Sequence, residues 1–134
     1  MSYLKNKAGQ KFSILAANNA GHGTTGDAGN ITAKISLDFG AAASLSDTNP
    51  TELDSTNFPG VYVFDLTQSE TNADVLTIKA TSTTASVSID LVTINTVDAR
   101  KGYTDGPLIG RVISDGTTEA TVTKGQVIRG IVLD

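Results

Sequence analysis

The stretch ITAKISLDF, residues 31–39, carries the clearest secondary-structure signal in the chain. Its apolar residues stand at every second position, with Thr, Lys, Ser and Asp between them. Such alternation puts the apolar side chains on one face of an extended strand and the polar side chains on the other. It therefore predicts a half-buried strand that has Ile31 and Phe39 on the same apolar face.

Further strand candidates lie on both sides of this stretch. They cover residues 11–17, 60–67, 75–81 and 86–94, and residues 82–85 are placed to join the last two as a hairpin. The sequence GVYVFDLT at 60–67 is apolar on both faces near its centre, which predicts an inner strand covered on two sides. Short strands separated by turns, without intervening helices, favour an all-β sandwich or barrel.

The connecting segments have different characters. Residues 40–46 are ambiguous between a short strand and a turn, and residues 47–59 form a polar connection with two prolines. The sequence QSETNAD at 68–74 predicts a turn or one helical turn. The sequence NNAGHGTTGDAGN at 18–30 is a loop with little to bury, and we interpret its Gly-rich part, 21–29, as a flexible arm that orders on assembly.

The C-terminal part changes character at residues 97–107, where charges, two glycines and a proline cluster. We expect a linker there. Residues 108–134 follow as a short β-rich segment that packs on the core or on a neighbouring subunit. The expected organisation is an N-terminal strand and flexible arm at 1–29, a core at 30–96, the linker, and this C-terminal segment.

Composition excludes several classes of protein. The chain has 134 residues and no cysteine, which removes disulfide frameworks, thiol catalysis and Cys-ligated zinc, and fits assembly in a cytoplasm. Its net charge is -4, and no basic block offers a face for nucleic acid. No apolar run approaches the roughly 20 residues that span a bilayer. We interpret the N-terminus as a mature start rather than a signal peptide.

Three pieces of the middle segment resemble an immunoglobulin-like domain of tailed-phage structural proteins. They are NITAKISLDFGAAASLSDTNPTEL at 30–53, PGVYVFDLTQSETNADVLTIKATS at 59–82 and SVSIDLVTINT at 86–96. Their order and spacing carry the likeness, which covers about half the chain; the two flanks have no counterpart in it. The resemblance implies an immunoglobulin-like β-sandwich and a part of a virion.

From this resemblance we expect a capsid decoration, or cement, protein. Its partners would be the major capsid protein and further copies of itself, with a trimer as the guess for the homo-oligomer. The alternatives are a tail, neck or baseplate protein that uses the domain as an adaptor, or a module that binds host glycans. Glycan sites usually present aromatic platforms, and the chain has no Trp and three Tyr, which disfavours the last alternative.

Few residues suggest chemistry, and each has a plainer interpretation. His22 is the only histidine and stands between glycines without an evident catalytic partner. Asp47, Asn49, Glu52 and Asp54 could approach a cation, but turn carboxylates are the ordinary explanation. Within ETNAD we expect Glu70 and Asn72 to satisfy local backbone donors, with a recognition loop as the alternative. We therefore predict no enzyme, no cofactor and no metal site.

Basic side chains gather after residue 99. They offer a surface that could dock on an acidic partner, although a solvated face explains them equally well. The candidate partner-contact residues are Arg100, Lys101, Arg111 and Arg129.

Overall fold

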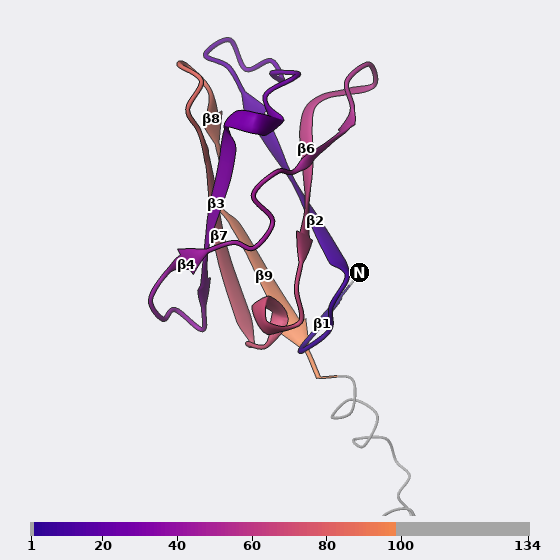
Figure 1. The fold of residues 1–134 in the computed structure, drawn as a ribbon, viewed down its shortest axis with the longest axis vertical. Helices are drawn as coiled ribbons and strands as arrows, with labels where there is room; N and C mark the ends of the chain where they lie inside the picture. The colour runs from indigo at the N-terminus through magenta and orange to yellow at the C-terminus, as the bar shows by residue number, and fades with distance from the viewer. Residues whose placement is uncertain (1, 99–134) are drawn as a thin grey trace, which may run out of the picture. The chain divides into compact units, whose positions relative to one another are not determined.

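The computed structural model describes residues 2–98, which form two β-sheets packed as a sandwich (Figure 1). One sheet has the spatial order β1 (Tyr3–Leu4), β9 (Val92–Val97), β7 (Val75–Ser82), β3 (Ile31–Leu37) and β4 (Ala43–Ser44). The other has the order β5 (Thr51–Asp54), β6 (Phe58–Leu66), β2 (Gln10–Ala17) and β8 (Ser88–Ile89). Two short 3₁₀ turns, η1 (Ala28–Asn30) and η2 (Ser69–Thr71), complete the elements. The predicted all-β sandwich is confirmed.

The core lies between the inner faces of the two sheets. Alternate residues of β3, beginning with Ile31, are buried as the period-two pattern predicts. From the opposite sheet, Phe12 of β2 and Phe64 of β6 are register partners, and their rings stack with centroids 5.2 Å apart. Each large apolar side chain of this kind contributes about 1.5–3 kcal/mol when fully buried. The packing of the two sheets against each other is therefore the main source of stability.

The strand predicted at 31–39 ends earlier than expected, at Leu37. Asp38 and Phe39 have φ angles of 49° and 63°, and the Gly40 amide donates to the Leu37 carbonyl oxygen at 2.9 Å. Two left-handed central residues define the type I′ turn that suits a tight hairpin. This turn interrupts the alternation, so Phe39 is 77% exposed, and its predicted burial was wrong.

The segment predicted as one strand at 86–94 is two strands in different sheets. β8 pairs with β2, whereas β9 pairs with β7, so residues 82–85 do not close the expected hairpin. Ile89 and Ile94 are both buried although they stand five positions apart. A straight strand would point them to opposite faces, and the crossing between sheets is what allows both to reach the core.

Two further expectations for the middle of the chain need correction. The connection at 47–59 contains β5 and the start of β6. β6 is an inner strand, between β5 and β2, but it is covered on one face only. Tyr62 is buried, whereas Val61 and Val63 are half-buried on the outer face.

The sandwich also begins before residue 30, where the sequence analysis placed the start of the core. β2 pairs with β6 along six residues and supplies Phe12, Ile14 and Ala16 to the interior. The described unit ends at Asp98, inside the predicted linker at 97–107. The remainder of that linker and the predicted C-terminal segment at 108–134 lie outside the described residues.

Candidate functional site

The four basic residues proposed from sequence as partner contacts lie outside the residues that the structure describes. They are Arg100, Lys101, Arg111 and Arg129. Within residues 2–98 the sequence has ten acidic side chains, five lysines and no arginine. The sandwich therefore carries the chain's excess of negative charge. Candidate contacts with a partner are sought on its surface.

The Gly-rich segment 18–30 is held against β6 rather than standing free as the expected flexible arm. A Cβ added at Gly23 would lie 1.8 Å from the Pro59 carbonyl oxygen, so the two backbones approach as closely as only glycine permits. The Tyr62 hydroxyl donates to the Thr24 carbonyl at 2.8 Å and accepts from the Asp27 amide at 2.7 Å. These buried partners are far away in the sequence, which is why the loop's composition did not reveal them.

Asp27 fixes the other end of this loop to β7. Its buried carboxylate accepts from the Ser82 hydroxyl at 2.5 Å, from the Asn30 side-chain amide at 2.8 Å, and from the Thr84 hydroxyl. Burial raises the pKa of Asp27, but the bonds from Ser82, Thr84 and Asn30 outweigh it and hold the pKa below its usual value. The carboxylate therefore stays charged as a structural clamp.

His22 sits at the exposed turn of the same loop. Its amide donates to the Asn18 side-chain oxygen at 3.1 Å, and its carbonyl accepts from the Asn18 amide at 2.9 Å. These contacts place the His22 backbone in a local turn, which fits a structural rather than a catalytic interpretation of this residue.

The carboxylates considered for a cation serve separate backbone groups. Glu52 accepts from the Gly26 and Gly60 amides at 2.9 and 3.1 Å. Asp47 accepts from the Asn49 and Asp65 amides, and Asp54 from the Thr56 and Asn57 amides. Over residues 2–98 no group of three or more His, Cys, Asp or Glu side chains is arranged to hold a metal ion. Asp54 and the contact of Asp47 with Asn49 match the turn-carboxylate explanation, whereas Glu52 and the contact of Asp47 with Asp65 join segments distant in the sequence.

Glu70 lies at the corner between β6 and β7 and is buried. It accepts from the Ser46 amide at 2.6 Å, and from the amide and the hydroxyl of Thr67 at 2.9 Å each. Burial raises the pKa of Glu70, yet these donors lower it by more, so the pKa lies below its usual value. The predicted role of satisfying local backbone donors is confirmed for Glu70, whereas Asn72 is exposed.

Besides Leu91 and Val97, two sets of apolar side chains are exposed that the sequence analysis did not predict. The first is on β2, β5 and β6, where Leu15 and Val61 are register partners on the outer face and Leu53 and Phe58 are about half exposed. The second is Phe39, on the turn after β3. The signal for Leu15 was present in the sequence, because a residue adjacent to buried Ile14 in a strand must face the other way.

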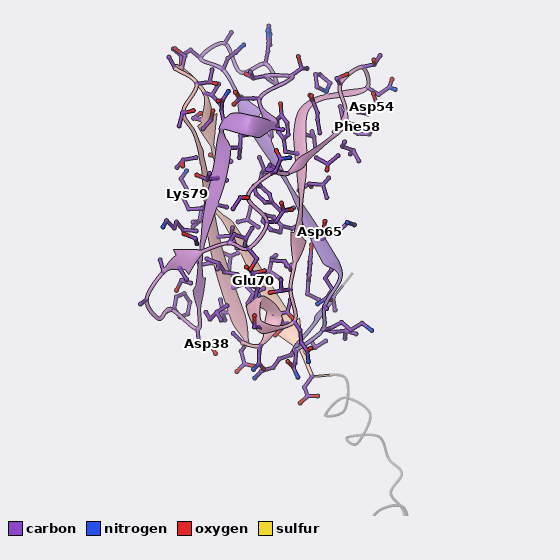
Figure 2. All side chains as sticks on the ribbon, in the orientation of Figure 1. Asp38, Asp54, Phe58, Asp65, Glu70 and Lys79 are labelled. Atoms are coloured by element: carbon purple, nitrogen blue, oxygen red, sulfur yellow. The ribbon has the colours of Figure 1, made fainter. Side chains whose placement is uncertain are left out.

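The turn that carries Phe39 is fastened to the start of β7. The Asp38 carboxylate accepts from the Asp74 and Val75 amides at 2.9 and 3.0 Å, and the Asp38 amide donates to the Val75 carbonyl at 2.8 Å. Lys5 pairs with Asp74 at 3.0 Å. This hydrogen bond and the charge of Asp74 raise the pKa of Lys5, so it stays a cation among carboxylates. Figure 2 shows Asp38 at the end of the sandwich opposite Asp54 and Phe58.

Comparison of the chain with protein-family models, with curated proteins and with solved structures gave no match. In the part of the chain that the structure describes, no helix has the length and apolar character needed to cross a membrane. The functional argument therefore starts from the sandwich itself and from the resemblance stated for residues 30–96.

Proposed function

We propose that this chain is a structural protein of a tailed-phage virion, and specifically a capsid decoration protein. It binds the outer surface of the head and stabilises the assembled shell. Its partners are the major capsid protein and other copies of itself, with which it forms a homo-oligomer, in this proposal a trimer. It is assembled in the host cytoplasm, resides in the virion and has no enzymatic role.

One observation carries this proposal: most of the buried core of the sandwich comes from the resembling stretch, and β2 supplies the rest. The sequence GVYVFDLT supplies Tyr62, Phe64 and Leu66 to the core. The ETNAD sequence supplies Glu70, which ties the corner after β6 to the Ser46 amide. The likeness to an immunoglobulin-like domain of virion proteins therefore rests on positions with structural roles, and not only on exposed residues.

The surface of the sandwich is compatible with a role in protein contacts. Carboxylates such as Glu52 and Asp47 accept internal hydrogen bonds that tie the loops to the strands, and the large apolar side chain of Phe39 remains exposed. Exposed apolar groups beside polar rims are typical of surfaces that bind proteins. The basic residues after position 99 add positive charge that suits an acidic partner.

The mechanism is mass action. A protein that binds the assembled shell, and not its free subunits, shifts the equilibrium towards the shell by an amount that grows with occupancy. A stable contact of this kind requires roughly 1,200 Å² or more of buried surface. Multiple copies, each bridging neighbouring capsid subunits, would supply that area.

Co-sedimentation with phage heads that lack this protein tests the proposal. We expect saturable binding with a defined copy number, and no further binding to heads that already carry a full complement. Tails without heads are the comparison particle. Binding to tails alone would replace the decoration role by a tail or neck role, and binding to neither would contradict a virion role.

A further inference from the structure

Phe39 occupies a position that the fold alone does not explain. Its φ angle of 63° lies in the left-handed region, which is unfavourable for a residue with a Cβ and especially for a bulky one. The side chain is 77% exposed, the highest exposure among the large apolar residues of the described chain, so burial does not offset this cost. Asn or Gly is the usual choice at such a turn position.

Hydrogen bonds fix the backbone of the turn that carries the ring. The Gly40 amide donates to the Leu37 carbonyl, and the Ser36 hydroxyl donates to the Gly40 carbonyl at 2.7 Å. The Asp38 carboxylate accepts from the amides of Asp74 and Val75, where β7 begins. A rigid aromatic side chain loses little conformational freedom when it binds, which makes it an effective anchor. Ala41 and Ala42, which are small and exposed, follow the turn.

The surroundings of Phe39 are acidic. Asp38 is the exposed neighbour of Phe39 in the chain. Asp74 directly precedes β7, its amide donates to Asp38, and its side chain is 74% exposed. Lys5 is the cation paired with Asp74, and its charge also interacts with Asp38 and Asp98. Three carboxylates thus act electrostatically on one ammonium group, and a partner with basic side chains around its binding pocket would complement this end of the sandwich.

We propose that Phe39 is the anchor residue of a protein contact, and that its partner is a virion protein with a surface apolar pocket bordered by Lys or Arg. Buried aromatic anchors of this kind dominate the affinity of many interfaces. The proposal depends on the proposed function for the identity of the particle. It goes further because it names the residue, the end of the sandwich and the chemistry of the partner surface.

The substitution Phe39→Gly tests this contact, because glycine relieves the turn while removing the ring. We expect the purified full-length variant to unfold at a urea concentration no lower than that of the wild type. In co-sedimentation we expect its affinity for the particle to fall by about tenfold or more. Phe58→Ala, at the opposite end of the sandwich, is the matched control and should change the affinity by less than about threefold.

The outcomes separate the two proposals. If the wild type binds heads and Phe39→Gly binds them equally well, the decoration role stands and the anchor is wrong. If the wild type binds only tails and Phe39→Gly weakens that binding, the decoration role fails and the anchor stands. A clear loss of stability in Phe39→Gly would show that the ring supports the fold, which overturns the anchor. Binding of the wild type to neither particle overturns both.

Discussion

Glu70 shows at the scale of one residue how the fold uses a charge. A buried carboxylate loses hydration, which disfavours its charged form. Here the Ser46 amide and the amide and hydroxyl of Thr67 replace the lost water. One side chain thereby fixes the corner after β6 to the segment that follows β4.

Glu70→Gln should lower the free energy of unfolding by about 1–3 kcal/mol at neutral pH, because the amide group of Gln turns a donor towards backbone donors. The pKa of Glu70 is lower in the folded state than the ordinary value of 4.5, so its contribution is present above that value and is lost as the pH falls through the folded pKa. Urea unfolding at several pH values measures this: the gap between wild type and variant should narrow on acidification.

Asp65→Asn is the control for this experiment. Asp65 pairs with Lys11 on the exposed outer face, and such surface pairs contribute only about 0–1 kcal/mol. We expect this variant to stay close to the wild type at neutral pH. If Glu70→Gln also left the free energy of unfolding unchanged at neutral pH, the buried carboxylate would not support the corner as described.

Gly23 links the scale of the residue to that of the element, because it lets the loop 18–30 lie directly on β6. Gly23→Ala would place a Cβ 1.8 Å from the Pro59 carbonyl oxygen, and backbone cannot move aside as a side chain can. We expect a loss of at least about 3 kcal/mol in unfolding free energy. Thermal and urea unfolding measure it.

Gly29→Ala in the same loop is the matched comparison, since no atom lies within 4 Å of the added Cβ. We expect a change of less than about 1 kcal/mol. Equal stability of the two variants would contradict the close packing of the loop against β6.

At the scale of strands, the sequence predicts features that follow from local periodicity. It does not predict features that depend on contacts between distant parts of the chain. The alternation after Ile31 and the buried face of β7 follow from periodicity. The split of the 86–94 segment depends on which sheet each end joins, and no local pattern encodes that choice. The early end of β3 could have been suspected, because an acidic residue and a glycine flank Phe39, but an aromatic residue is unusual in a left-handed position.

The candidate sites divide in the same way. The structural role of Glu70 was predicted from its place in a tight corner. The clamp formed by Asp27 and Tyr62 was missed, because its partners are 35 or more positions apart in the chain. Phe39 was assigned to the core because period-two counting continued through a turn.

At the scale of the whole molecule, the described sandwich is an acidic unit with short edge strands. β1, β4 and β8 have two residues each and β5 has four, which leaves little free edge for pairing with other strands. Contacts with a partner are therefore expected to use side chains, as the proposed role of Phe39 requires, rather than extension of a sheet.

The thermal stability of heads, measured with and without the protein, tests the central claim most directly. Heads that lack the protein would be heated alone and with increasing concentrations of it, and disruption of the shell would be followed by light scattering. We predict that the disruption temperature rises with occupancy and levels off when binding saturates. A disruption temperature that stays constant while the protein is bound would contradict a decoration role.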